Sequence, residues 1–215
     1  MAGRRVPDTG KVLTLLKARY GKNPHTQLKH RDNCELFVAA LLSPQCTDKQ
    51  VDKTTAELFT RYKGFDDYAN SDIKTLYSML KGLNYYKTKA RNLKAAAILI
   101  RSGFNGKVPK TIKELTTIPG VGRKVANVML SEGFGINEGI AIDTHCAVVS
   151  RRLGYSRQKD PKKIELDLMK RIPERDWGIA SNLFIELGRD TCKAAKKECE
   201  RCVLRRICPS STSRS

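Results

Sequence analysis

Four cysteines near the end of the chain are spaced so that they could share one metal centre. They form a Cys-x6-Cys-x2-Cys-x5-Cys pattern with basic residues between them, over Cys192, Cys199, Cys202 and Cys208. Four thiolates in so short a span suit either tetrahedral zinc or a four-iron, four-sulfur cluster. Two disulfides are the alternative, which a reducing compartment disfavours. We interpret the other three cysteines as small hydrophobic residues in apolar helical stretches: Cys34, Cys46 and Cys146.

A glycine-rich joint between two expected helices is the second candidate for chemistry. It reads Ile118-Pro119-Gly120-Val121-Gly122-Arg123-Lys124. The two glycines allow a tight turn and leave backbone amides uncovered, and amides at a helix N-terminus attract a phosphate oxygen. The alternative is an ordinary helix-turn-helix joint with a glycine cap.

The composition favours nucleic acid as the partner. Lys and Arg total 41 against 22 Asp and Glu, which gives a formal net charge of +19 for 215 residues. Such an excess is typical of nucleic-acid binding, and a chain of this length forms one or two compact domains. The longest apolar run, Leu36 to Leu42, is too short for a membrane span, and the first residues lack the apolar core of a secretory signal.

The elements that must position these residues are helices. Apolar residues recur at intervals of three and four, and no convincing alternating strand competes with this pattern. Asp32-x-x-Glu35 and Thr47-x-x-Gln50 fit the capping box at a helix start. Further N-caps are expected at Asp8 or Thr9, Ser71 and Thr111. The sequence therefore predicts an all-α protein of about ten short helices.

Four motifs together resemble endonuclease III, the helix-hairpin-helix DNA glycosylase family. Besides the hairpin, they are Leu41-Leu42-Ser43-Pro44-Gln45-Cys46-Thr47-Asp48, Ile142-Asp143-Thr144-His145 and Gly188-Arg189-Asp190-Thr191-Cys192 with its cysteine spacing. Their order and separation match over nearly the whole chain, which is far more specific than the hairpin alone. The resemblance implies a monomeric, intracellular enzyme, associated with DNA in the cytoplasm or nucleoid. Its partner would be double-stranded DNA with a damaged pyrimidine or an abasic site. The enzyme would flip and remove oxidised pyrimidines and then nick the strand by β-elimination.

The resemblance implies that Lys124 is the nucleophile, and the surrounding residues agree with that role. An amine nucleophile must be partly neutral, and a lysine close to a helix N-terminus beside Arg123 should have its ammonium form disfavoured. Lys124 would attack the sugar C1′ and form a Schiff base, from which the C2′ proton is lost. A simple phosphate contact is the alternative role.

Asp143 is the second catalytic candidate. The resemblance implies a carboxylate here that assists the lysine and stabilises positive charge on the sugar. Asp143 also precedes a helical stretch from Thr144 and would make a good N-cap. The two roles are compatible, because capping would fix the position of the carboxylate.

By resemblance, Gln45 fills the space left by the flipped base, and a side chain after Gly82 wedges the opposite strand. The chain departs here from the usual Gly-Leu-aromatic-x-x-Lys-Ala pattern, because its loop is longer and closer to that of adenine-specific mismatch glycosylases: Gly82-Leu83-Asn84-Tyr85-Tyr86-Lys87-Thr88-Lys89-Ala90. Tyr85 could therefore replace Leu83 as the wedge, with helix packing by the tyrosine pair as the alternative. Asp48 could line the base pocket or stand in the first turn of a helix. Backbone contacts are expected from Pro119, Gly120, Val121, Gly122, Arg123, Lys193, Lys196 and Lys197.

The implied architecture is two helical domains with Lys124 and Asp143 facing each other across a cleft. One is a helical barrel of residues 27–137 that contains the helix-hairpin-helix; the other is an iron-sulfur cluster domain of residues 1–26 and 138–215. The resemblance selects the [4Fe-4S] cluster over zinc for the four C-terminal cysteines.

Two other functions stay open. A monofunctional glycosylase would remove uracil, thymine or adenine from mismatches, and a non-catalytic helix-hairpin-helix module would only bind DNA. Lys124 favours the bifunctional enzyme over both. An adenine-specific enzyme would also need a catalytic glutamate near Leu41 to Thr47, and none stands between Glu35 and Glu57.

Overall fold

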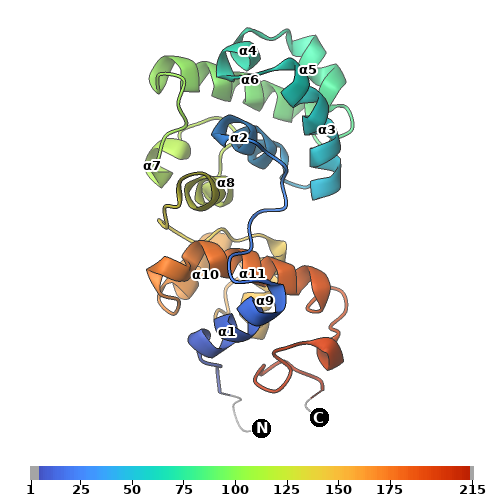
Figure 1. The fold of residues 1–215 in the computed structure, drawn as a ribbon, viewed down its shortest axis with the longest axis vertical. Helices are drawn as coiled ribbons and strands as arrows, with labels where there is room; N and C mark the ends of the chain where they lie inside the picture. Colours follow the sequence, from blue (N-terminus) through green and yellow to red (C-terminus); the bar gives the residue numbers. More distant parts are fainter. Residues whose placement is uncertain (1–4, 214–215) are drawn as a thin grey trace. The chain divides into compact units, whose positions relative to one another are not determined.

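The fold is entirely helical, as Figure 1 shows for the computed structural model, which describes residues 5–213. Within that range there are eleven α-helices and no β-strand, so the all-α prediction is confirmed. The chain divides into two compact units: Gln27–Ile136 forms one, and the N-terminal residues through Thr26 form the other with the chain from Asn137 onward. None of the helices in the described range is long and apolar enough to cross a membrane.

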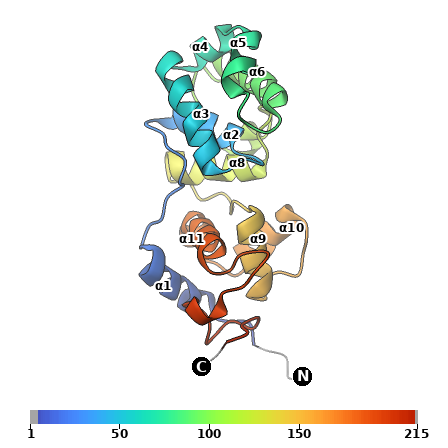
Figure 2. The same cartoon turned by 90° about the vertical axis from the view of Figure 1, so that its right-hand side faces the viewer.

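The Gln27–Ile136 unit is built around helix α2 (Asn33–Leu42), which is buried from Glu35 to its end. A helix that is apolar on every side must be covered all round. Figures 1 and 2 both show α2 inside the surrounding helices. The helices of this unit that follow α2 are α3 (Asp48–Arg61), α4 (Phe65–Asn70), α5 (Ile73–Leu80), α6 (Tyr86–Gly103), α7 (Ile112–Leu115) and α8 (Arg123–Val128), which continues as a π-helical segment, η1 (Met129–Gly133).

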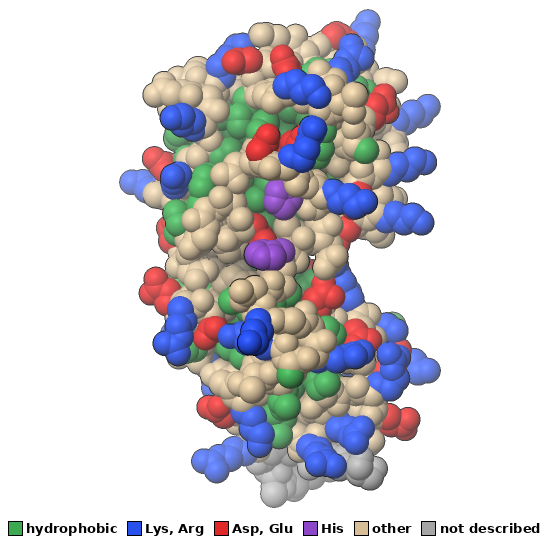
Figure 3. Space-filling model, viewed as in Figure 1, with side chains coloured by type: hydrophobic (Ala, Val, Ile, Leu, Met, Phe, Trp, Pro, Cys, Tyr) green, Lys and Arg blue, Asp and Glu red, His purple; other side chains and the backbone are tan. Residues whose placement is uncertain are grey.

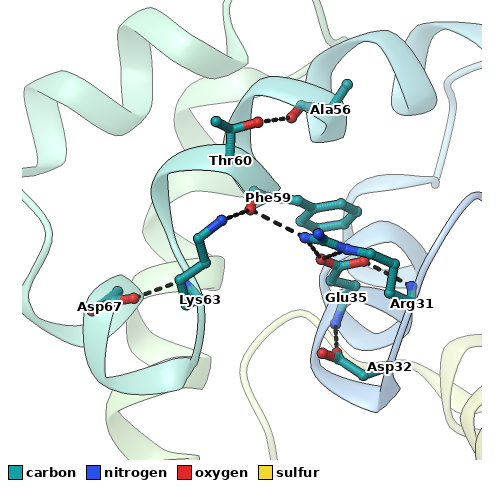
Figure 4. Close-up of polar contacts among 8 residues, drawn as sticks. All are labelled: Arg31, Asp32, Glu35, Ala56, Phe59, Thr60, Lys63 and Asp67. Carbon is teal, nitrogen blue, oxygen red and sulfur yellow. Dashed lines mark hydrogen bonds and ion pairs between the residues drawn. The ribbon is translucent and has the colours of Figure 1, made fainter.

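The start of α2 differs from the predicted capping box. Asp32 Oδ1 accepts a hydrogen bond from the Glu35 amide at 2.9 Å, as predicted, but Glu35 does not return to the Asp32 amide. Its carboxylate instead accepts from the Arg31 amide at 2.8 Å and from the Arg31 guanidinium (Figure 4). Glu35 is only 7% exposed, and a buried carboxylate is best compensated by a charged donor.

Other predicted helix starts can be compared directly with the structure. At Thr47 and Gln50 both halves of the capping box form. Asp8 caps α1 (Thr9–Tyr20) and Thr111 caps α7, so these two predictions are confirmed. The Ser71 prediction is wrong by one residue: Asp72 caps α5, because its carboxylate accepts from the Thr75 amide at 2.8 Å.

The other unit packs around α11 (Trp177–Asp190). Its remaining helices are α1, α9 (Thr144–Arg152) and α10 (Pro161–Met169), with 3-10 segments η2 (Glu174–Asp176) and η3 (Cys199–Arg201). Figure 2 shows α11 between α1 and α9, and its residues Leu183 and Phe184 are fully buried in the core of this unit. Helix α11 therefore supports the start of α9, which Asp143 precedes. It also leads into the segment of the four cysteines, residues 192–208, which we call the cysteine loop.

Candidate active site and cysteine loop

The hairpin places Lys124 at the start of α8. The Val121 amide donates to the Ile118 carbonyl at 3.0 Å to close the turn, and Gly120 has φ +82°. A Cβ added at Gly120 would lie 2.9 Å from Asn92 Nδ2 and 3.0 Å from Leu41 Cδ1, so glycine is required by both conformation and packing. Gly122 differs, since it is exposed, has an ordinary φ and would place a Cβ in open space.

Lys124, the candidate amine nucleophile, lies just after the glycines of this hairpin. Lys124 is the second residue of α8 and is partly buried, in the unit Gln27–Ile136. Pro119 is partly buried and Val121 is 6% exposed, so the hairpin presents mainly its glycine backbone to solvent. That arrangement suits an anion that approaches the first turn of α8.

Asp143 is the N-cap of α9, as the sequence predicted. Its Oδ1 accepts a hydrogen bond from the Cys146 amide at 2.7 Å, and the side chain is partly buried. Asp143 belongs to the unit that contains α11, whereas Lys124 belongs to the other, so the predicted juxtaposition of the two stays a prediction.

Two small residues of α11 hold the segment around Asp143. The sequence analysis did not single out Ser181, and it named Gly188 only as part of a motif, without this role. Ser181, which is 3% exposed, donates its hydroxyl to the Ala141 carbonyl at 2.6 Å. A Cβ added at Gly188 would lie 2.7 Å from His145 Cβ, so only glycine permits this approach of α11 to α9. The signal was available, since residues seven apart share one face of a helix, and small ones mark a close backbone contact.

The two candidate duplex-reading residues both project from loops of the Gln27–Ile136 unit. Gln45 is exposed between α2 and α3, and Tyr85 is 67% exposed just before α6. Leu83 is 3% exposed and belongs to the core, while Tyr86 packs edge-on against Tyr77 with ring centroids 6.3 Å apart. The two tyrosines therefore differ: Tyr86 packs against a neighbouring helix, and the Tyr85 side chain is exposed and available as a wedge.

Asp48, the predicted base-pocket residue, is the first residue of α3 and is partly buried. It follows the Thr47 cap and so occupies the acidic first-turn position that the sequence analysis gave as its alternative role.

The four C-terminal cysteines line one small cavity of about 20 Å³, together with Arg152 and Thr191. All seven cysteines of the chain are free thiols, so the alternative of two disulfides is not realised. Four thiols that line the same cavity fit the donor set of an iron-sulfur cluster. Among residues 5–213, however, no three His, Cys, Asp or Glu side chains are grouped closely enough to hold a single metal ion. The ligand set therefore stays a prediction.

The environments of these thiols differ. Burial raises the pKa of Cys202 and of Cys208, and the neighbouring cysteines of the loop add to the rise. Burial also acts to raise the pKa of Cys199, but hydrogen bonds from Thr212 and the charge of Lys197 lower it overall. Thiolates gathered in such a cavity need a cationic partner, which a metal centre would supply.

Arg152 organises the loop that contains the first of these cysteines. Its guanidinium donates to the Cys192 carbonyl at 2.8 Å, to Cys192 Sγ at 3.3 Å and to the carbonyls of Lys193 and Ala194 at 2.9 and 3.0 Å. The last residue of α9 thus fixes the chain where it leaves α11. The sequence analysis missed this contact, because it joins residues forty positions apart.

The predicted phosphate-binding lysines of this loop are all exposed. Lys193 Nζ pairs with Glu198 at 2.7 Å and Lys197 Nζ donates to the Ser210 carbonyl at 3.0 Å, so each would exchange an internal contact for a phosphate. Lys196 is exposed on the same loop. Figure 3 shows Lys and Arg side chains spread over both units on the face drawn, in keeping with the net charge of +19.

Of the three other cysteines, two are packing residues as predicted. Burial raises the pKa of Cys34 to about 12 and also raises that of the fully buried Cys146. Cys46 also packs against the core as predicted, but its placement in a helical stretch is wrong. It lies in the turn between α2 and α3, where Lys89 Nζ donates to its Sγ at 2.9 Å.

Comparison with known proteins agrees with this geometry. Residues 38–174 match the family model described as HhH-GPD superfamily base excision DNA repair protein. Endonuclease III of Synechocystis sp. is 40% identical over 98% of this chain and 95% of the relative, and endonuclease III of Bacillus subtilis is 39% identical over 89% of this chain and 88% of that relative.

The solved structures include one described as a trapped endonuclease III-DNA covalent intermediate, an estranged-adenine complex. It shares 38% identity with this chain and has a TM-score of 0.88, with 94% of each chain covered. The resemblance inferred from the sequence motifs is therefore confirmed. The chain belongs to the HhH-GPD superfamily of base excision DNA repair proteins, and within it to the endonuclease III family.

Proposed function

We propose that this DNA glycosylase and AP lyase removes oxidised pyrimidines from double-stranded DNA through an amine nucleophile, Lys124. The observation that carries the proposal is the position of Lys124 in the first turn of α8, directly after the exposed glycine backbone of the hairpin. The similar endonuclease III whose structure was solved as a covalent DNA intermediate supports the same chemistry. The place of action is the DNA of the cell, in the cytoplasm or nucleoid.

The reaction needs a neutral amine and a way to stabilise positive charge. Lys124 Nζ uses its lone pair to attack C1′, and the base leaves with the electrons of the glycosidic bond. The attached nitrogen then loses a proton, and the C1′–O4′ bond breaks as O4′ takes up a proton, so the sugar ring opens and leaves a Schiff base between Lys124 and C1′. The Schiff base acidifies the C2′ proton, and loss of that proton expels the 3′-phosphate oxygen, which nicks the strand. The Asp143 carboxylate stabilises the charge that develops on the sugar, from a position fixed by its cap bond to Cys146.

The lesion class and the type of activity are tested together by a panel of single-lesion duplexes. The panel contains an oxidised pyrimidine, an abasic site, a uracil mismatch, an adenine mismatch and an undamaged control, each incubated with and without borohydride. We expect release and nicking at the oxidised pyrimidine and covalent trapping there and at the abasic site. Base release without nicking, at the mismatches alone, would support the monofunctional glycosylase. Binding without any release would support the non-catalytic module.

We further propose that Cys192, Cys199, Cys202 and Cys208 hold a [4Fe-4S] cluster. Their common cavity and the Arg152 contacts that shape the loop support this assignment. When bound, such a cluster supplies iron-sulfur bonds that tie the loop into one rigid piece.

Iron content is the direct measurement for the cysteine loop. The protein purified without oxygen should be yellow-brown and contain about four irons per chain. Cys202→Ser should lose colour and iron, because it removes one thiolate, whereas Cys46→Ser should keep both. A colourless wild-type protein with one zinc per chain would refute the iron-sulfur cluster and favour a zinc site at the same four cysteines.

Two glycine substitutions in the hairpin separate folding from DNA binding. Gly120→Ala should lower the free energy of unfolding by at least about 1 kcal/mol, because it forces a Cβ into the left-handed region and against Asn92. Gly122→Ala should lower the melting temperature less than Gly120→Ala, since its Cβ meets nothing and only a glycine N-cap is lost, but it should weaken binding to duplex DNA because it covers the exposed backbone. Thermal melting and fluorescence anisotropy measure the two effects. Unchanged affinity in Gly122→Ala would remove the hairpin backbone from the DNA contact.

A further inference from the structure

The two candidate duplex-reading residues share an uncommon backbone conformation. Among residues 5–213 only three non-glycine residues have a positive φ, and two of them are Gln45 at +59° and Tyr85 at +57°. Residues with a Cβ adopt this region at an energetic cost and keep it only when their surroundings impose it. Backbone strain of this kind concentrates at functional sites. The contacts that hold Gln45 and Tyr85 in this conformation are therefore candidates for a functional role.

The two loops are tied to each other by hydrogen bonds. Asn84 Nδ2 donates to the Gln45 carbonyl at 2.6 Å, from the residue directly before Tyr85. One turn into α6, Lys89 Nζ donates to the Pro44 carbonyl at 2.8 Å and to Cys46 Sγ at 2.9 Å. The residues on both sides of Gln45 and the Gln45 backbone itself are therefore held from the segment that carries Tyr85.

The burial of Lys89 shows that these contacts belong to a built arrangement rather than to a surface lysine. Lys89 is only 7% exposed, and an ammonium group can be buried only if its donors are satisfied. Lys87, two residues earlier on the same helix, is exposed. The turn that receives these bonds is closed on its own side by the Cys46 amide, which donates to the Ser43 carbonyl at 3.0 Å.

We propose that Asn84 and Lys89 are positioning residues that hold Gln45 and Tyr85 as one preformed duplex-reading element. This inference rests on the proposed function, because it concerns how the enzyme opens the base pair. Insertion of two side chains is most productive when neither loop must be ordered at that moment. The preformed pair should matter most for a lesion in a well-stacked pair and least for an abasic site, where no base has to leave the stack.

The test compares two substrates of the same enzyme. Asn84→Asp preserves the shape of the side chain but removes the donor to the Gln45 carbonyl. We expect it to slow single-turnover excision of a well-stacked oxidised pyrimidine about tenfold, the effect of one lost hydrogen bond, with abasic-site nicking unchanged. Asn84→Gln retains an amide donor and should restore part of the rate, and Thr88→Ala, an exposed neighbour, should match the wild type.

A second pair of variants compares the loss of a buried lysine with the loss of an exposed one, so that each variant loses one positive charge. Lys89→Met removes the buried donor and Lys87→Met removes an exposed charge, so only Lys89→Met should lower the ratio of lesion excision to abasic nicking. Lys89→Met also removes a buried contact and so lowers stability. If the Lys89→Met protein does not fold, the result for Asn84→Asp decides whether the inference holds. Equal loss on both substrates, or an unchanged ratio in Asn84→Asp, would overturn the inference.

Base opening can also be measured without chemistry, which separates this inference from the proposed function. A 2-aminopurine beside the lesion reports unstacking in the Lys124→Gln background. Asn84→Asp in that background should lower the fluorescence rise on binding. A wild-type enzyme that opens the pair but never nicks abasic DNA would refute the lyase proposal and leave the positioning role standing. A rise that is equal with and without Asn84→Asp would refute the positioning role alone.

Discussion

Lys124→Gln is expected to abolish strand nicking and borohydride trapping while DNA affinity stays within about twofold of the wild type. The substitution removes the only atom that can form a Schiff base at this position, and a nucleophile has no partial substitute. It leaves the hairpin backbone and the partly buried first turn of α8 in place. Nicking and trapping are measured on an abasic duplex by denaturing gels, and affinity by anisotropy.

A matched lysine controls for the loss of positive charge. Lys113 is an exposed residue of α7, the helix that precedes the hairpin, so Lys113→Gln removes the same charge without removing the proposed nucleophile. It should retain both nicking and trapping. A Lys124→Gln protein that is still trapped covalently on DNA would exclude Lys124 as the nucleophile and leave it the role of a phosphate contact.

Helix starts could be predicted where the side chains act only on their own backbone. Thr47 and Gln50 are exposed and form the full capping box that their spacing predicts. Glu35 has the same spacing from Asp32, yet it is buried and binds Arg31 instead (Figure 4). A local motif therefore decides the outcome only when burial does not bring a stronger partner to the same atoms.

The sequence indicated which residues belong to the candidate site, but not which residues hold its loops in place. The length of the loop and its likeness to that of adenine-specific mismatch glycosylases made Tyr85 an alternative to Leu83 as the wedge, and the exposures of 67% for Tyr85 and 3% for Leu83 favour Tyr85. Asn84, Lys89 and Arg152 were invisible, because each acts on a backbone carbonyl about forty residues away. Backbone acceptors carry no sequence signature, so such contacts follow only from the tertiary fold.

Net charge was a sound guide to the partner and a poor guide to individual lysines. The excess of +19 predicted nucleic acid, and the family assignment agrees with it. Lys193 and Lys197 nevertheless already have acceptors within the cysteine loop. A phosphate must compete with those acceptors, and this competition lowers what each lysine can contribute to affinity.

Asp143→Asn is expected to slow base release by about 10², with the free energy of unfolding changed by less than about 0.5 kcal/mol. Asparagine is as good an N-cap as aspartate, so the bond from the Cys146 amide survives while the negative charge is lost. Asp143→Ala should lose the charge and the cap, and we expect it to be less stable by about 1 kcal/mol as well as slow.

Asp160→Asn is the matched control for Asp143, since Asp160 caps α10 in the same way, accepting from the Lys163 amide at 2.9 Å, and is exposed. It should leave both the rate and the stability unchanged. Single-turnover base release and chemical denaturation measured on all three variants separate the two roles of Asp143. If Asp143→Asn keeps the wild-type rate and only Asp143→Ala loses stability, the carboxylate serves as a helix cap alone. The charge that develops on the sugar must then be stabilised by another group.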